Sequence, residues 1–171
     1  MEATIERAPD RRLLEWLQKH HVEYDLHHHV PTTTARETAR VEAVEPRTMV
    51  KSVVVQAADG RNAILALEAT ERVDLAKAAH ALGTTDVHLV TEAQLIEMAP
   101  DCDPGTWPPV GAIFGMPVLA DSALRDEPEV TFTAGSHEFA VRLDQEAWAR
   151  AGDVHYVDLA EGRSEEPAWA R

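Results

Sequence analysis

The sequence has 171 residues, of which 44% are hydrophobic, and this length predicts one domain that buries roughly two-thirds of its unfolded surface. The formal net charge of −14 excludes broad, sequence-independent nucleic-acid binding, and DNA is not an expected partner. The chain has no run of about 18 apolar residues, so we expect no membrane span.

The N-terminal part of the chain predicts two helices with a strand between them. Asp10 fits the N-cap of an amphipathic helix over residues 10–20, and residues 22–28 alternate weakly, as in a strand. Thr34 and Glu37 have the spacing of a capping box, which predicts a short helix after them.

A β-hairpin is expected next. Residues 50–57 are rich in β-branched side chains and predict a strand. Asp59-Gly60 is a hairpin turn signal, and residues 63–67 have the composition of the returning strand.

The rest of the chain predicts shorter elements. A helix over residues 74–82 ends at Gly83, and Thr91 with Gln94 forms a capping box for a helix that reaches residue 98. The remaining expected elements are short strands at 87–90, 112–114, 117–120, 130–134, 138–143 and 154–159, and a helix from Asp144 to about residue 151. Interleaved hairpins and helices predict a mixed α/β (α+β) domain over residues 1–160, with a polar, disordered tail at 161–171.

A segment dense in glycine and proline, residues 101–111, cannot form a helix or an inner strand. It lies between two amphipathic stretches, so it is expected to be a rigid loop inside the domain. Gly105 and Gly111 permit close backbone approach, and Pro108 and Pro109 stiffen the chain. The segment is therefore either a rigid connector or the wall of a site that presents backbone N–H and C=O groups.

Two side chains are candidates for partners of this loop. Lys51 lies among apolar, strand-forming residues, where it is either solvated at an edge or projects into a pocket and attracts a phosphate or carboxylate. His137 follows Gly135-Ser136, where a histidine is either a turn residue or a group that orients a ligand or a water molecule.

Metal, thiol and nucleotide chemistry find little support in the sequence. Neighbours in a strand point to opposite faces, so His27-His28-His29 favours a structural or solvent-facing role over a metal site, and no metal or cofactor is expected. The single cysteine, Cys102, excludes an internal disulfide, and its flanking aspartates disfavour the thiolate of a nucleophile. The motifs G-x-S-x-G, G-x-G-x-x-G and the P-loop are absent.

The charge is unevenly distributed. The first 60 residues hold 8 basic and 10 acidic side chains, whereas the remainder hold 8 and 20. An RNA substrate would therefore have to meet a local basic patch, for which the candidates are Arg36, Arg40, Arg47, Lys51 and Arg61. The first residues lack the apolar core of a signal peptide, so a cytoplasmic location is expected.

Four segments together resemble the YbaK / prolyl-tRNA-synthetase-associated family of aminoacyl-tRNA editing domains. They occur in the family's order across about residues 10–150, and one of them, the loop, resembles a D-C-E-P-G-A-x-P-P-F-G signature with Asp103, Thr106 and Val110 as departures. The four segments are Thr32-Thr33-Thr34-Ala35, Met49 to Val55, Asp101 to Gly111, and Ala134-Gly135-Ser136-His137.

This resemblance implies a twisted, partly barrel-like mixed sheet and a deacylase that hydrolyses a mischarged aminoacyl-tRNA ester, without metal or covalent intermediate. It implies that Lys51, Gly105 and His137 are the catalytic residues. It also assigns substrate contacts to Pro109, Gly111, Gly135, Ser136, Thr33 and His29. A tight pocket suits small residues such as alanine, cysteine or serine.

The resemblance also implies partners. The tRNA acceptor end is the expected ligand, and an aminoacyl-tRNA synthetase could supply the grip on tRNA that an acidic surface lacks. The alternative is a non-catalytic module of the same fold that binds a nucleotide or an aminoacyl-like small molecule. The sequence leaves the oligomeric state, the amino acid and the tRNA open.

Overall fold

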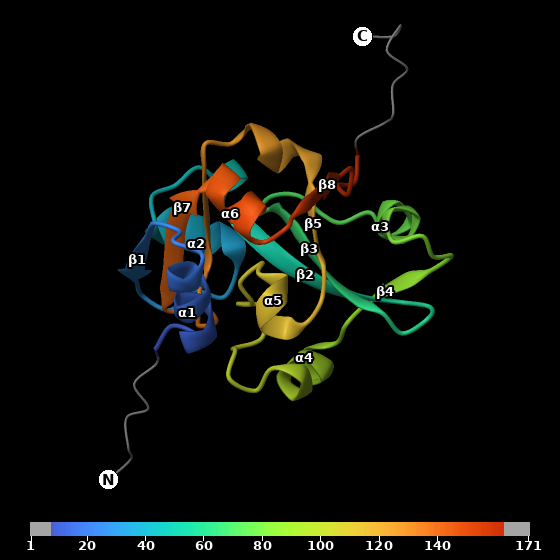
Figure 1. Ribbon diagram of the computed structural model, residues 1–171, viewed down its shortest axis with the longest axis horizontal. Coiled ribbons are helices and arrows are strands. Elements are labelled where there is room, and N and C mark those ends of the chain that lie inside the picture. The colour runs from blue at the N-terminus through green and yellow to red at the C-terminus, as the bar shows by residue number, and fades with distance from the viewer. Residues whose placement is uncertain (1–7, 163–171) are drawn as a thin grey trace, which may run out of the picture.

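The structure, a computed structural model, describes residues 8–162 and arranges helices around two β-sheets (Figure 1). The helices are α1 (Arg11–Lys19), α2 (Ala35–Val41), α3 (Leu75–Ala81), α4 (Glu92–Met98), α5 (Gly111–Phe114) and α6 (Gln145–Ala151), with the short 3-10 helices η1 (Pro46–Thr48) and η2 (Ser122–Asp126). The strands are β1 (Tyr24–His28), β2 (Val50–Ala57), β3 (Asn62–Glu68), β4 (Val87–Leu89), β5 (Val118–Asp121), β6 (Glu129–Thr133), β7 (Phe139–Asp144) and β8 (His155–Val157).

The two sheets differ in strand direction. The smaller sheet, β1-β7-β6, is antiparallel. In the larger sheet, β4-β2-β3-β5-β8, β2 pairs antiparallel with β3 and β4, whereas β5 runs parallel to β3 and β8. An isolated parallel bridge between Met49 and Thr131 brings the start of β2 beside β6, so the sheets meet there without closing a barrel. The predicted mixed α/β, partly barrel-like fold is confirmed.

The hairpin of β2 and β3 is the centre of the larger sheet. Its register pairs Lys51 with Leu67 and Val53 with Leu65. Residues 63–67 of β3 are all buried, because both faces of this strand are covered. Ile64 and Ala66 face the main core, and the residues that alternate with them face a second, smaller core. The continuous apolar run in the sequence therefore reflects a central strand.

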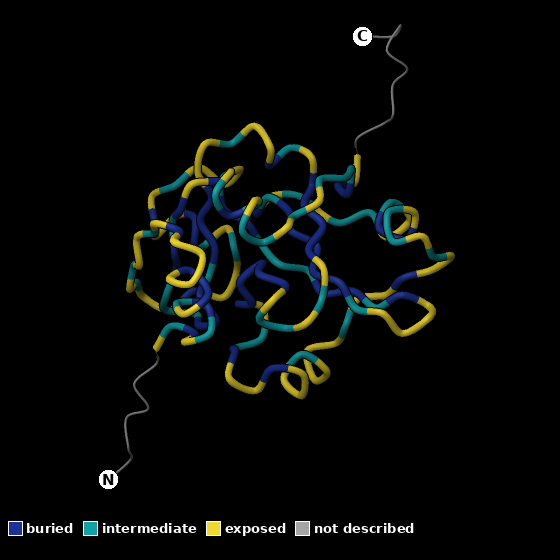
Figure 2. The backbone as a smooth tube through the Cα atoms, viewed as in Figure 1, coloured by how far each residue is buried: buried dark blue, intermediate teal, exposed yellow. Residues whose placement is uncertain are grey.

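The main core lies between the two sheets and helices α1, α5 and α6, and the second core lies between the larger sheet and α3. Figure 2 shows these buried segments in the interior, with exposed backbone concentrated in outer loops and on α4. The largest fully buried side chains of the main core include Trp148, Phe132, Leu13 and Leu17.

Polar caps fix where several helices begin. The Oδ1 atom of Asp10 accepts from the N–H of Arg12 at the start of α1. The predicted capping box of Thr91 and Gln94 is present in both directions. Thr34 accepts from the N–H of Glu37, but the Glu37 carboxylate turns back to the N–H of Thr33 instead of Thr34, so the first predicted box is only half formed.

The strand expected at residues 112–114 is wrong, because these residues belong to helix α5. The N–H of Met116 donates to the carbonyl of Gly111 at 3.2 Å, and Gly115 ends the helix with φ of +69°. An apolar run of three residues carries no periodicity, so only its packing decides its conformation. Phe114 stacks on Trp107, with ring centroids 4.1 Å apart. Of the expected tail, residues 163–171 lie outside the described residues.

Candidate functional site

A narrow recess lies where the start of β2 and helix α2 meet two loops. Its volume is about 20 Å³, room for one group of the size of a water molecule or a methyl group. Six of the twelve residues around it are threonines, and none carries a carboxylate or a thiol. The lining residues are Thr32, Thr33, Thr34, Ala35, Thr38, Met49, Val50, Lys51, Gly105, Thr106, Thr133 and His137.

Lys51 is the cation of this recess. It is half-buried on β2, and within the described residues no carboxylate lies close enough to form an ion pair with it. Burial, followed by repulsion from Arg36 and Arg72, lowers the pKa of its ammonium group, while Glu71 opposes this shift. An unpaired, partly desolvated ammonium favours an anionic ligand or a developing negative charge.

His137 is held by its backbone, which leaves its ring available. Its N–H donates to the Asp103 carboxylate at 3.3 Å, and its carbonyl accepts from the N–H of Thr32 at 3.0 Å. Within the described residues, no hydrogen-bond partner is found for the imidazole ring. The ring can therefore bind or orient a group placed in the recess.

Gly105 reaches the recess because its loop is clamped to the turn before His137. The N–H of Asp103 donates to the carbonyl of Gly135 at 3.0 Å, and the N–H of Gly135 donates to Thr106 at 3.0 Å. Gly105 itself has φ of +79°, a left-handed conformation that favours glycine, and no atom lies within 4 Å of the position of an added Cβ. The backbone therefore remains accessible at this point.

Threonine hydroxyls form the wall opposite the loop. The hydroxyls of Thr32 and Thr38 lie 2.7 Å apart, and Thr38 donates to the carbonyl of Thr34 at 3.0 Å. This chain of hydrogen bonds fixes α2 against the recess. Thr33 lines the recess as predicted, and it also lines the wider hollow beside it.

The wider hollow, here called the entrance hollow, has a volume of about 400 Å³. It shares Thr33, Gly105 and His137 with the recess, and its other lining residues are Glu92, Leu95 and Pro104. Its size falls within the range of small-molecule sites. A ligand can therefore occupy the entrance hollow and extend one small group into the recess.

The structure does not bring Pro109 or Gly111 to the recess. Both residues are buried, and the indole N–H of Trp148 donates to the carbonyl of Pro109 at 2.9 Å. A Cβ on Gly111 would lie 2.0 Å from the carbonyl oxygen of Met116. The second half of the glycine-proline segment is core, because Trp107 and Val110 pack in it, and only Gly105 and Thr106 reach the recess.

Three other predicted contact residues support the site without lining it. Gly135 is buried with φ of +80°, and an added Cβ would lie 2.9 Å from the Cβ of Asp10. Ser136 is buried and accepts from the N–H of Glu138 at 3.1 Å. The His29 side chain is 6% exposed, and its Nδ1 lies 2.7 Å from the carbonyl oxygen of Val30. Their predicted contact with substrate finds no support in this geometry.

The histidine tract fixes β1 to α2. The Nδ1 of His27 lies 2.5 Å from the buried carboxylate of Glu42, and the Nε2 of His29 lies 3.9 Å from its other oxygen. His28 instead stacks on Phe139, with ring centroids 4.5 Å apart. Over residues 8–162, no group of three or more His, Cys, Asp or Glu side chains is arranged to hold a metal ion.

Cys102 is part of the packing around α1. Its thiol donates to the Oδ2 of Asp10 at 3.0 Å, and burial, followed by this contact, raises the pKa of the thiol to about 12. A thiol with this pKa remains protonated at neutral pH and is a poor nucleophile. The expectation that Cys102 is not a nucleophile therefore agrees with the structure, but the causes are burial and Asp10 rather than the flanking aspartates.

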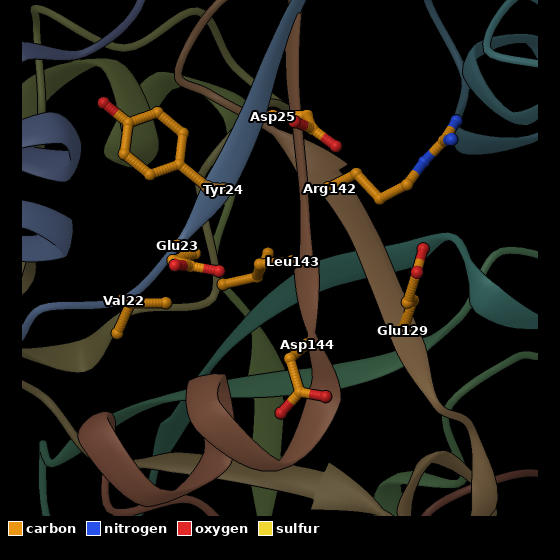
Figure 3. Close-up of a pocket in the computed structure, with 8 residues that line it drawn as sticks. All are labelled: Val22, Glu23, Tyr24, Asp25, Glu129, Arg142, Leu143 and Asp144. Carbon is orange, nitrogen blue, oxygen red and sulfur yellow. The ribbon is translucent and has the colours of Figure 1, made fainter.

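A separate hollow of about 600 Å³ lies on the smaller sheet (Figure 3), and neither Lys51 nor His137 lines it. Its charged residues are four carboxylates, Glu23, Asp25, Glu129 and Asp144, and a single arginine, Arg142. Figure 3 shows these side chains spread along the strands rather than converging on one point. The excess of negative charge disfavours a phosphate or an RNA chain there.

Sequence reasoning missed several residues of the site. Thr38 and Thr133 line the recess, but no motif spacing distinguishes them from ordinary threonines; Met49 and Thr106 also line it, and they lie in segments that the sequence singled out without assigning them to the site. Sequence reasoning also missed Arg72 as a neighbour of Lys51. Arg72 follows β3, and only the pairing of β3 with β2 in the sheet brings it close to Lys51.

Comparisons with known proteins agree with this geometry. Residues 29–151 match the family described as the aminoacyl-tRNA editing domain. The chain has a TM-score of 0.81 and 19% identity to the crystal structure of a hypothetical protein, covering 88% of this chain and 100% of that one. A candidate trans-editing enzyme for prolyl tRNA synthetase has a TM-score of 0.74 and 24% identity, covering 94% of this chain and 100% of that one.

A third similar structure is a scaffold protein from computational epitope grafting. It has a TM-score of 0.75 and 26% identity, and the match covers 90% of this chain and 97% of that one. No curated protein matches the chain. In the described part of the chain, every helix is too short or too polar to cross a membrane.

Proposed function

The chain belongs to the aminoacyl-tRNA editing domain family, and from this premise we propose that it hydrolyses the ester of a mischarged tRNA carrying a small amino acid. The observation that carries the proposal is the meeting of Lys51, Gly105 and His137 around one recess. These three residues come from β2, from the loop after α4 and from the turn after β6. No other feature of the described residues combines an unpaired lysine, an available imidazole and accessible backbone in one cavity.

The reaction asks little of the protein beyond positioning and charge. A water molecule adds to the ester carbonyl carbon, the bond to the terminal ribose oxygen breaks, and the proton from water ends on that ribose oxygen. The protein must hold the ester, place the water and stabilise the oxyanion. Lys51 supplies the positive charge for the oxyanion, the backbone at Gly105 holds the aminoacyl group, and His137 orients the water.

The size of the recess supports a small amino acid. With the aminoacyl group in the entrance hollow, its side chain projects into a recess of about 20 Å³. A methyl group fits this space, whereas a branched or aromatic side chain meets Met49 and the linked hydroxyls of Thr32 and Thr38. Steric exclusion of this kind discriminates strongly against larger side chains and weakly against smaller ones.

The partner in this proposal is the acceptor end of a mischarged tRNA in the cytoplasm. A chain with a net charge of −14 offers little surface for the rest of a tRNA. A synthetase that holds the tRNA body therefore fits the proposal as a second partner.

The test is a panel of tRNAs mischarged with alanine, cysteine, serine and, as larger controls, valine and phenylalanine. We expect hydrolysis of at least one small-residue ester, and we expect Lys51→Ala to lower kcat/KM at least about 100-fold, because a stabilising charge at the oxyanion is lost. Lys19→Ala, at the exposed end of α1, is the matched control and should behave as the wild type.

The alternative, a non-catalytic binding module, makes the opposite prediction. If the whole panel survives at high enzyme concentration while adenosine or aminoacyl-adenosine amides raise the melting temperature, the fold is used for binding alone. Equal activity of Lys51→Ala and wild type would also contradict the proposed role of the lysine.

A further inference from the structure

A second hollow lies on the other side of Lys51 from the entrance hollow. This lateral hollow has a volume of about 720 Å³, and it occupies the region where β2, β4 and the start of α3 come together (Figure 1). Lys51 lines both the recess and the lateral hollow, so the two cavities are neighbours. The lining residues are Lys51, Val53, Arg72, Val73, Asp74, Leu75, Ala76, Leu89 and Glu161.

The floor of the lateral hollow is apolar and open to solvent. Leu75 is 37% exposed and Leu89 is 50% exposed, although both belong to ordered elements. Val53 and Val73 are partly buried beside them. An exposed apolar floor of this kind suits a flat, partly apolar group such as a nucleobase.

The cations beside this floor form no ion pair within the described residues, whereas several others in the chain are neutralised. Arg61 pairs with Asp59, Arg47 with Glu127 and Lys77 with Asp158. By contrast, over residues 8–162 Lys51, Arg36 and Arg72 have no carboxylate within ion-pairing distance. Arg36 and Arg72 each lie close enough to Lys51 to repel its ammonium group, and Glu71 is near enough to oppose them. Concentrated positive charge in a chain of net charge −14 points to an anionic ligand at this place.

The backbone around Arg72 is fixed in position. Its carbonyl accepts from the N–H of Glu161 at 2.8 Å, and the next residue, Val73, forms a bridge with Ala160. Asp74 uses its carboxylate to cap α3 by accepting from the N–H groups of Ala76 and Lys77. Glu71 precedes Arg72 in the chain and Glu161 lines the hollow, but within residues 8–162 neither forms an ion pair with the Arg72 guanidinium, which is presented from a fixed segment.

We propose that the lateral hollow binds the nucleotide that precedes the terminal adenosine of tRNA, with its phosphate at Arg72 and its base over Leu75 and Leu89. The inference rests on the proposed deacylase function and adds the direction in which the RNA chain runs across the surface. The aminoacyl group occupies the entrance hollow with its side chain in the recess, the ester lies beside Lys51 at the mouth of the recess, and the RNA chain leaves past Lys51 toward Arg72. The charges agree with this direction, because the entrance hollow carries Glu92, which attracts the amino group of the aminoacyl moiety.

The test compares two substrates, of which only one carries this nucleotide. One is an aminoacylated acceptor-stem minihelix, and the other is the same amino acid esterified to adenosine alone. For Arg72→Gln we expect a KM about tenfold higher on the minihelix with kcat unchanged, because one charged contact to phosphate is lost. Hydrolysis of the aminoacyl-adenosine should not change. The matched control is Arg61→Gln, at the far end of the β2-β3 hairpin.

A binding measurement separates this inference from the proposed activity. A fluorescent minihelix with an uncleavable 3′-amide should bind Arg72→Gln about tenfold more weakly than wild type, and Leu89→Ser should also weaken it. This result would support the lateral hollow even if no ester were hydrolysed. Equal KM and Kd for wild type and Arg72→Gln, or an equal loss on both substrates, would overturn the inference while leaving the deacylase intact.

Discussion

At the scale of single residues, the site depends on groups that lack partners. Within the described residues Lys51 forms no ion pair, although Glu71 is close enough to act on its charge, and the His137 ring has no hydrogen-bond partner. By contrast, the carboxylate of Asp10 is occupied by Arg12 and by the Cys102 thiol. The thiol stays protonated and is a poor nucleophile, so the proposed reaction is assigned to the recess.

The lowered pKa of Lys51 predicts the pH dependence of activity. The charged ammonium is the active form, so kcat/KM should be level near neutral pH and fall as the pH rises through a pKa that lies below the usual 10.5. The measurement is kcat/KM from pH 6 to 9.5, corrected for spontaneous ester hydrolysis. Lys51→Arg keeps its charge at every pH in this range, so its alkaline decline should disappear.

The same comparison controls for the substrate. Its amino group titrates identically with both enzymes, so any decline shared by wild type and Lys51→Arg belongs to the ester. An identical decline of kcat/KM at alkaline pH in the two enzymes would show that Lys51 is not the group that titrates. If Lys51→Arg is too slow to assay, the pH dependence of minihelix amide binding provides the same comparison.

At the scale of elements, two loops and one helix are clamped together to make the recess. The turn before His137 receives hydrogen bonds from the loop of Gly105 and from the N-terminus of α1, where the N–H of Asp10 donates to Ala134 at 2.7 Å. On the other side, Glu42 ties α2 to β1 through His27. These hydrogen bonds explain why buried residues such as Gly135 matter for the recess although they do not line it.

Helix α5 offers a test that distinguishes a packing role for Gly111 from a role in substrate binding. Gly111→Ala should lower the free energy of unfolding by about 3 kcal/mol, because the new methyl group would overlap the backbone oxygen of Met116. The control is Ala112→Ser at the next, exposed position of the same helix, which should change stability by less than about 0.5 kcal/mol. Urea denaturation followed by tryptophan fluorescence measures both.

The activity of the same variant decides the role of the glycine. If Gly111 acts only through packing, the fraction of Gly111→Ala that remains folded should keep the KM of wild type. If Gly111→Ala had wild-type stability and a raised KM, that result would instead indicate that Gly111 contacts the substrate.

At the scale of the whole molecule, charge restricts how RNA can bind. The chain carries 16 basic and 30 acidic side chains, and the hollow on the smaller sheet is mainly acidic. The cations without ion pairs near the recess are few, and they lie on one side of it. A tRNA can therefore approach with its acceptor end, whereas its body meets a surface that repels it.

This distribution predicts a shallow salt dependence. With about two phosphate contacts, from Arg36 and Arg72, the slope of log K against log salt for the single-stranded end should be about −1.4. Full-length tRNA should bind no more tightly than the minihelix. Fluorescence anisotropy between 50 and 300 mM KCl gives both values, and a slope steeper than about −5 would indicate an extensive RNA interface that this account excludes.

Elements whose signals are local could be predicted from the sequence. Asp10, Thr91 and Asp144 cap helices as predicted, and the Asp59-Gly60 turn joins β2 to β3, because caps and turns are set by residues only a few positions apart. The sequence also singled out Lys51, Gly105 and His137. Tertiary contacts were needed to establish that residues 112–114 are helical, that Pro109 and Gly111 are buried, and that Arg72 lies near Lys51. Those outcomes depend on contacts between distant segments, and one sequence has no local pattern that encodes such contacts.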